Sequence, residues 1–168
     1  GSLYASDLYR GRVGLIQQGA ERLRLPCIQA GRKDASKPYE GLGQMDRVLC
    51  DVPCSGYGVI RRKPEIRYKP LSSVKELPSL QYAILENGAA LVKPGGLLVY
   101  ATCTLNPKEN GQVALRFLEE HPEFEPSPFS LPGVEHLVDE PAHTVTLLPI
   151  NGGSDGFFAA RFRRKGEL

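Results

Sequence analysis

Two cysteines and an acid follow the ends of short apolar runs in this sequence. Asp51 closes the run 47–50, Cys54 follows behind a proline, and Cys103 comes soon after the run 97–100. A thiol beside a second thiol, an acid and several cations is suited to act as an activated thiolate. Core packing is the alternative for either thiol, because free cysteine also packs as a small hydrophobe.

The segment after Cys54 is strongly basic. Against the single acid Glu65 it carries five cations, which are Arg61, Arg62, Lys63, Arg67 and Lys69. This local charge of about +4 suits a phosphate backbone, although the whole chain has a net charge of only +2. Tyr57 and Tyr68 offer rings on which unpaired bases can stack. An ordinary solvated surface is the alternative, and the position beside Asp51 favours RNA.

Two further acids follow predicted strands nearer the N-terminus. Asp7 lies between the run 3–5 and a predicted helix, where an acid commonly receives the ribose hydroxyls of an adenosine cofactor. Asp34 follows the next strand, where it could accept a hydrogen bond from the amino group of an adenine. The alternatives are a helix cap for Asp7 and a turn residue for Asp34.

The composition is that of one globular domain, spanning residues 1–168, of which Gly1 and Ser2 resemble a cloning remnant. No apolar run approaches the ~18 residues of a membrane span, and the N-terminus shows no signal-peptide pattern. The four cysteines contain no C-x-x-C pair, and the histidines show no metal spacing relative to them. We therefore expect a cytoplasmic protein without a metal site.

Strands and helices alternate along the chain. The predicted strands are 3–5, 27–30, 47–50 and 97–100, and the predicted helices are 9–25, 78–92 and 106–120. This order predicts an α/β fold with a doubly wound, mostly parallel sheet. The segments 144–148 and 157–162 add an antiparallel C-terminal hairpin, joined by a turn at 151–156. Because ligands bind beyond the carboxyl ends of such strands, the acids and thiols are expected at one rim.

Two motifs carry a family resemblance. The segments 51–56 (DVPCSG) with 61–66 (RRKPEI), and 100–110 (YATCTLNPKEN), resemble the Sun/Fmu-type RNA cytosine-C5 methyltransferases. The closing segment 155–161 (DGFFAAR) resembles that family's last strand. The resemblance covers about residues 3–164, and the most similar members are the bacterial enzymes that act on small-subunit ribosomal RNA.

The resemblance implies a methyltransferase fold, S-adenosylmethionine as cofactor and ribosomal RNA as partner. It implies that Cys103 adds to C6 of cytosine, which makes C5 electron-rich enough to take a methyl group. Cys54 would assist release of the product, and Asp51 would hold the base edge near N3 and lie close to the methyl donor. Asp7 and Asp34 match the ribose and adenine acids. The target base should be unpaired or flipped out.

Two neighbouring classes of methyltransferase fit these motifs less well. Exocyclic-amine enzymes carry Asn/Asp-Pro-Pro-Tyr/Phe where this chain has DVPC at 51–54, because an amine needs no thiol. In DNA cytosine-C5 enzymes the cysteine of the Pro-Cys pair attacks and a Glu-Asn-Val segment follows. This chain instead has a second thiol after Thr102.

One departure from the family concerns the cofactor. The family has a Gly-rich loop between its first core strand and helix, N-terminal to the position of Asp7, and this sequence contains no such segment. We therefore expect an N-terminally truncated catalytic domain that is weak or inactive alone and can self-associate through the truncated sheet. The alternative function is a non-catalytic RNA-binding or assembly module that keeps the fold.

Overall fold

The computed structural model describes residues 1–130, 142–149 and 154–166. By its contacts the chain divides into two compact units, Gly1–Tyr39 and Glu40–Leu168. Each unit is described by itself below. Within the described residues, no helix is both long enough and apolar enough to cross a lipid bilayer.

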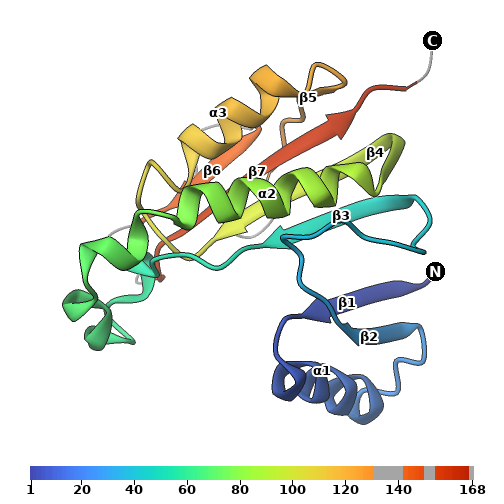
Figure 1. Ribbon diagram of the computed structural model, residues 1–168, viewed down its shortest axis with the longest axis horizontal. Helices are drawn as coiled ribbons and strands as arrows, with labels where there is room; N and C mark the ends of the chain where they lie inside the picture. Colours follow the sequence, from blue (N-terminus) through green and yellow to red (C-terminus); the bar gives the residue numbers. More distant parts are fainter. Residues whose placement is uncertain (131–141, 150–153, 167–168) are drawn as a thin grey trace. The chain divides into compact units, whose positions relative to one another are not determined.

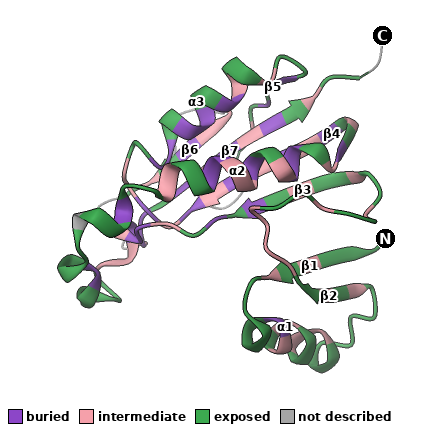
Figure 2. Cartoon of the chain, in the orientation of Figure 1, coloured by how far each residue is buried: buried purple, intermediate pink, exposed green. Residues whose placement is uncertain are grey.

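The N-terminal unit is a strand–helix–strand crossover (Figure 1). Strand β1 (Leu3–Asp7) leads into helix α1 (Arg10–Arg22), and strand β2 (Ile28–Arg32) returns parallel to β1. The structure describes every residue of this unit, and Val13 alone among them is buried. Figure 2 accordingly shows these three elements mostly in the colour of exposed residues. Seven large apolar side chains are more than a third exposed: Leu3, Tyr4, Leu8, Tyr9, Leu15, Leu23 and Leu25.

The C-terminal unit is built on a five-stranded mixed sheet in the order β3-β4-β7-β5, with β6 also paired to β7. Its strands are β3 (Met45–Asp51), β4 (Val92–Thr102), β5 (Phe124–Pro126), β6 (Thr144–Leu147) and β7 (Phe157–Arg164). Strands β3 and β4 are parallel, whereas β7 runs antiparallel to β4, β5 and β6. The predicted parallel strands and antiparallel C-terminal hairpin are therefore confirmed. Residues 150–153, which include most of the predicted turn, lie outside the described residues.

Helices α2 (Leu77–Ala90) and α3 (Gly111–Glu120) pack against this sheet (Figure 1). Their inward side chains form one core with the sheet, which includes Leu85 and Phe117 from the helices and Leu98, Tyr100 and Phe162 from the strands. Each such fully buried apolar side chain contributes roughly 1.5–3 kcal/mol to folding. The core fixes the carboxyl ends of β3 and β4. The loops that follow these two strands contain Cys54 and Cys103 and are called the thiol loops below.

The largest differences from the predicted boundaries are at the starts of β4 and α3. Strand β4 begins at Val92 rather than 97, since the Pro94–Gly95 corner bends within the strand and Gly95 takes a positive φ of 77°. Helix α3 begins at Gly111 rather than Asn106. Asn106, Pro107 and Glu109 have the spacing of a capping box at a helix start. In the structure, however, the Glu109 carboxylate accepts from Ser55 and Gln81, and the Asn106 backbone N–H donates to Thr104 Oγ1.

Three short 3-10 helices lie between β3 and α2. They are η1 (Tyr57–Val59), η2 (Pro64–Tyr68) and η3 (Leu71–Val74). The sequence predicts an irregular basic loop here, and η2 carries much of its charge. Ile66 is buried and anchors η2, while the side chains around it are exposed.

Candidate functional site

The two thiol loops leave the sheet at the same edge. Strand β3 ends at Asp51 and strand β4 at Thr102, and the two strands are parallel neighbours with Asp51 opposite Ala101. The Val52 N–H extends the pairing by donating to Ala101 O at 3.2 Å. Cys54 and Cys103 therefore emerge side by side, as the rule for carboxyl ends of parallel strands predicts.

The thiols of Cys54 and Cys103 are in direct contact, with 3.1 Å between their Sγ atoms. Both residues are partly exposed. Burial, together with a hydrogen bond to the Cys103 thiol, raises the pKa of Cys54 to about 12. Cys54 therefore keeps its proton at neutral pH, and this state suits a proton donor better than a nucleophile.

Two groups at the carboxyl end of β3 have raised pKa values. Asp51 is exposed as a residue, but partial desolvation of its carboxyl raises its pKa above the ordinary value. Burial raises the pKa of Cys50 to about 12, and its Sγ lies 3.9 Å from Ile84 O. Cys50 is thus a core thiol, in agreement with its place inside the strand.

Buried side chains hold the peptide groups on both sides of Cys54. The Ser55 N–H donates to Glu109 Oε2 at 2.8 Å, and Gln81 Nε2 donates both to Pro53 O and to Glu109 Oε2 at 2.9 Å. Glu109 and Gln81 are fully buried. Because the flanking groups are fixed, the position of Cys54 is fixed by bonds that do not involve its thiol.

The peptide groups around Cys103 are held in a similar way. Thr102 Oγ1 donates to Asn110 Oδ1 at 2.7 Å, and Asn110 Nδ2 donates to Thr104 O at 2.9 Å. A hydrogen bond of 2.7 Å between Ser55 Oγ and Thr104 Oγ1 joins the two loops. All of these groups are buried.

A third segment closes on the two loops at a pair of glycines. The Gly58 N–H donates to Cys103 O at 3.0 Å, and the Gly156 N–H donates to Gly58 O at 2.8 Å. A Cβ atom on Gly58 would lie only 2.0 Å from Gly156 O. The backbone can approach this closely only where Gly58 lacks a side chain.

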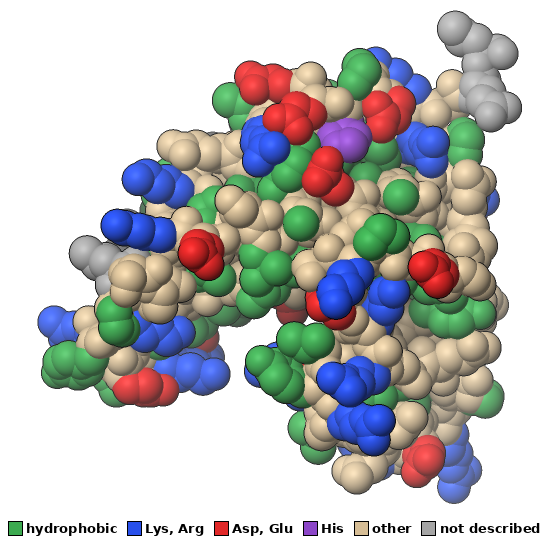
Figure 3. Space-filling model, in the orientation of Figure 1, with side chains coloured by type: hydrophobic (Ala, Val, Ile, Leu, Met, Phe, Trp, Pro, Cys, Tyr) green, Lys and Arg blue, Asp and Glu red, His purple; other side chains and the backbone are tan. Residues whose placement is uncertain are grey.

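The predicted RNA-binding cations lie on the surface of the loop around η1 and η2. Arg61, Arg62, Lys63 and Arg67 are exposed, and blue side chains outnumber red ones over this segment in Figure 3. Arg62 forms an ion pair, because its Nε lies 2.5 Å from the carboxylate of the buried Asp155. Part of its charge is therefore already compensated within the protein.

A cavity of about 490 Å³ lies beside the thiol loops. It is lined by Tyr57, Val74, Lys75, Pro78, Leu105, Asn106 and Lys108. Tyr57 follows Cys54 by three residues and Leu105 follows Cys103 by two, so the cavity adjoins the site. The cations Lys75 and Lys108 were missed by the prediction, although Lys108 lies within the second motif.

Asp7 and Asp34 belong to the N-terminal unit, where they lie near the carboxyl ends of neighbouring parallel strands. Asp7 Oδ1 accepts the Tyr9 N–H at 2.8 Å, and Oδ2 lies 3.5 Å from Arg12. Asp34 accepts hydrogen bonds from Ser36, which lower its pKa. Each carboxylate keeps acceptor capacity beyond these bonds, so both fit the ribose hydroxyls or adenine amino group of an adenosine cofactor.

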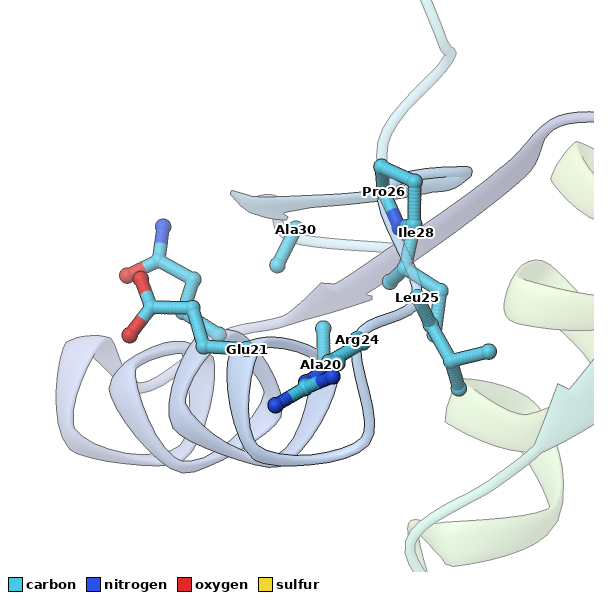
Figure 4. Close-up of a pocket in the computed structure, with 8 residues that line it drawn as sticks. Ala20, Glu21, Arg24, Leu25, Pro26, Ile28 and Ala30 are labelled. Carbon is cyan, nitrogen blue, oxygen red and sulfur yellow. The ribbon is translucent and has the colours of Figure 1, made fainter.

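The N-terminal unit also contains an open cavity of about 510 Å³ between α1 and β2. Figure 4 shows side chains from both elements and from the loop between them around it, including Ala20, Leu25, Ile28 and Ala30. None of the predicted site residues lines this cavity. We therefore place the candidate site at the thiol loops. Among the described residues, no group of three or more His, Cys, Asp or Glu could hold a metal ion.

Three buried residues at the site were not assigned a function by the prediction: Gln81, Glu109 and Asn110. The last two belong to the second motif, but only their surroundings in the fold reveal what they bind. The Glu109 carboxylate accepts hydrogen bonds from three N–H donors, and a sequence pattern does not reveal such contacts.

The fold and the site define a class of protein. Parallel strands joined by helices and continued by an antiparallel hairpin form the methyltransferase fold, which the chain shares with the solved structures similar to it. Residues 1–163 match the family described as 16S rRNA methyltransferase RsmB/F. The chain belongs to that family.

Individual relatives agree with this assignment. The chain is 44% identical over 176 residues to a probable ribosomal RNA small subunit methyltransferase B of Bacillus subtilis, covering 99% of this chain and 38% of the relative. It resembles the crystal structure of PH0851 with a TM-score of 0.88 and 33% identity, covering 98% and 37% of the two chains. The structure of NSun6 from Pyrococcus horikoshii with SFG has a TM-score of 0.83 at 23% identity, covering 99% and 42%. The last likeness concerns the fold alone.

Proposed function

We propose that this chain carries the catalytic residues of an enzyme that methylates C5 of a cytosine in small-subunit ribosomal RNA, with Cys103 as the nucleophile. The contact between the Sγ atoms of Cys54 and Cys103, at 3.1 Å, supports this proposal most directly. Attack on the base needs only one thiol, whereas attack by one thiol followed by its assisted release from the product uses a second thiol in contact with the first. The family membership supports the same reaction class.

Cys103 Sγ forms a bond to C6, and the electron pair of the C5–C6 double bond moves toward C5. After methylation, the C5–H bond breaks, its electron pair restores the C5–C6 double bond, and the C6–S bond breaks. The proton from C5 passes to the Cys54 thiolate that remains once Cys54 has protonated the departing sulfur. Cys54 donates its proton to the departing Cys103 thiolate. Its raised pKa keeps the proton on Cys54 at neutral pH, and the 3.1 Å contact places that proton within reach of the Cys103 sulfur.

Asp51 is proposed to hold the base edge near N3. Partial desolvation raises the pKa of its carboxyl, which favours the protonated form that can donate a hydrogen bond to N3. Such a bond would draw electrons from the ring and assist attack at C6.

S-adenosylmethionine supplies a methyl group bound to a positively charged sulfur when it is present. Asp7 and Asp34 would hold its ribose and adenine, as the acceptor capacity of both carboxylates allows. This sequence has no Gly-rich turn N-terminal to Asp7. We therefore propose that the chain alone binds the cofactor weakly, and micromolar affinity in a calorimetric titration would contradict this.

The RNA would lie along the exposed cations Arg61, Arg62, Lys63 and Arg67. Arg62 would contribute less than Lys63 and Arg67 because of its ion pair with Asp155. The cavity beside the thiol loops offers the ring of Tyr57 for stacking and the cations Lys75 and Lys108 for a phosphate. The chain spans 38% of the length of its Bacillus subtilis relative. The complete activity is therefore proposed for a protein in which this sequence is joined to the remaining part that such relatives have.

A methylation assay tests the proposal. The joined protein is incubated with small-subunit ribosomal RNA and S-adenosylmethionine labelled in its methyl group. We expect Cys103→Ala to abolish incorporation, while Cys27→Ala, a change of an exposed thiol in the N-terminal unit, leaves it unchanged. Full incorporation by Cys103→Ala would refute the nucleophile and favour the alternative of a non-catalytic RNA-binding module.

A further inference from the structure

We infer that Glu109 and Asn110 are positioning residues that together set the separation of the two thiols. Glu109 holds the loop of Cys54 and Asn110 holds the loop of Cys103, although the two residues are adjacent in the chain. The structural inference stands on hydrogen bonds alone. Its meaning for catalysis rests on the proposed function.

The Glu109 side chain is fully buried and is surrounded by N–H donors. Oε2 accepts from the Ser55 N–H at 2.8 Å and from Gln81 Nε2 at 2.9 Å, and Oε1 accepts from Asn106 Nδ2 at 2.8 Å. Both carboxyl oxygens of Glu109 therefore act as hydrogen-bond acceptors. Gln81 carries the same constraint to Pro53 O, so both peptide groups that flank Cys54 are fixed by one carboxylate.

Asn110 differs from Glu109, because its side chain acts both as an acceptor and as a donor. Its Oδ1 accepts the Thr102 hydroxyl at 2.7 Å, and its Nδ2 donates to Thr104 O at 2.9 Å. These two partners lie immediately before and after Cys103. A carboxylate at this position would face the Thr104 carbonyl oxygen with a second acceptor and lose that bond.

One hydrogen bond to the backbone fixes both Glu109 and Asn110. The Tyr100 hydroxyl donates to Glu109 O at 2.5 Å, and Tyr100 lies fully buried in β4. The dipeptide 109–110 is thereby fixed to the strand that delivers Cys103, while its Glu109 side chain reaches the loop from β3 that delivers Cys54. Thiol–thiol hydrogen bonds are weak, so they cannot hold a 3.1 Å separation without such a frame.

The separation matters because the proposed proton transfer runs from Cys54 to Cys103 over that distance. A loop displaced by about 1 Å can lower such a rate by about 100-fold. The exchange of Glu109 for glutamine keeps the volume but places an N–H₂ group where an acceptor is needed. One of the three donors then loses its partner, and the Cys54 loop loosens.

Disulfide formation measures the separation without any RNA or cofactor. The 168-residue chain carrying Cys27→Ser is treated with an aromatic disulfide, 4,4′-dithiodipyridine. A thiolate first attacks the reagent and releases one thiopyridone; the second thiol then displaces the other, closing the Sγ–Sγ bond. The reagent takes up both electrons of the oxidation, and the two thiol hydrogens end on the two thiopyridones. Release of the second thiopyridone reports closure, and peptide mapping identifies the bond.

We expect closure to be slower by about tenfold or more in Glu109→Gln and in Asn110→Asp, while the first step changes little. Glu119→Gln is the matched control, because this exposed carboxylate lies on α3 and is not one of the residues that hold the two loops. Val113→Ala is the stability control: it lowers Tm by removing buried volume from α3, and closure should keep its rate.

Unchanged closure in Glu109→Gln and Asn110→Asp, with native circular dichroism, would overturn the inference. Equal slowing in Val113→Ala would also overturn it, because the effect would then follow general destabilisation. If Cys103→Ala retains methylation while the closure results hold, the proposed function fails and the positioning role remains. In the methylation assay, the same two variants should lower kcat with little change in KM.

Discussion

The Sγ atoms of Cys54 and Cys103 lie 3.1 Å apart, although 49 residues separate them in the chain. Two parallel neighbouring strands explain this contact, because β3 and β4 end at the same edge and each thiol follows its strand within three residues. In the sequence, the residues between the two cysteines form the three 3-10 helices, α2 and β4. The contact therefore depends on the sheet as much as on the motifs.

The first prediction concerns the ionisation of Cys54. Because the raised pKa of about 12 keeps the thiol protonated, about one thiol in 10,000 is ionised at pH 8, against about one in four for an ordinary thiol. Alkylation of Cys54 by iodoacetamide should rise about tenfold per pH unit from pH 7 to pH 10 without a plateau. Mass spectrometry of the modified peptide measures the rate at each pH.

The other thiols provide internal controls for that titration. Cys50 should also resist alkylation, since burial raises its pKa to about 12, while the exposed Cys27 should react readily. A plateau for Cys54 near pH 9 would contradict the assignment of this thiol as a proton donor.

The second prediction concerns the glycine contact that closes the site. Gly58→Ala places a Cβ atom 2.0 Å from Gly156 O. Because Gly156 O is a backbone atom, the clash can be relieved only by moving the main chain. We expect a loss of about 1–3 kcal/mol in the free energy of unfolding, measured by urea titration. Gly111→Ala is the control, because its Cβ atom meets nothing within 4 Å at the start of α3. If both variants unfolded at the same urea concentration, the close approach would not be structurally important.

The third prediction separates the cations of the basic loop. Lys63→Ala and Arg67→Ala should each weaken RNA binding and reduce the slope of log K against log salt by roughly 0.7 if each contacts one phosphate of single-stranded RNA. Arg62→Ala should reduce the slope less, because its guanidinium pairs with Asp155. Filter binding at several salt concentrations measures the slopes.

Arg116→Ala serves as the control for these variants, since this residue pairs with Glu120 on α3. An equal reduction of the slope in all four variants would show that bulk charge, rather than this loop, governs binding.

The fourth prediction concerns the unequal burial of the two units. The N-terminal unit has Val13 as its one buried residue, whereas a core of fifteen buried residues, counted among those that the structure describes, supports the C-terminal unit. Amides of β1 and β2 should therefore exchange hydrogen faster than those of β4 in the chain alone. Exchange followed by mass spectrometry measures this, and equal protection would contradict it. Protection of β1 that rises with protein concentration would reveal the expected self-association.

The sequence was sufficient to predict the strands that carry the site. The apolar run before Asp51 and the one before Thr102 each predicted a strand, and parallel neighbours bring their ends together wherever a helix connects them. This reasoning placed Cys54 and Cys103 at one edge, which the structure shows. It needed only local patterns and one general rule of sheet topology.

Features that depend on distant partners could not be predicted in this way. Glu109 has the spacing of a capping box with Asn106, yet its carboxylate bonds Ser55, which lies 54 residues earlier. Helix α3 begins at Gly111 instead of near Asn106, and the buried Ser55 N–H and Gln81 side chain bind the carboxylate that would have capped the earlier start. Arg62 likewise gave no sign in the sequence of its ion pair with Asp155.

Trapping of a protein–RNA adduct tests the central proposal most directly. The joined protein carrying Cys54→Ala is incubated with ribosomal RNA and S-adenosylmethionine and separated on a denaturing gel. We predict that a covalent adduct accumulates, because Cys103 still attacks C6 while release lacks its proton donor, and that Cys54→Ala/Cys103→Ala forms none. Adduct formation by the double variant, or its absence from Cys54→Ala in a preparation that binds RNA, would contradict the assigned roles of the two thiols.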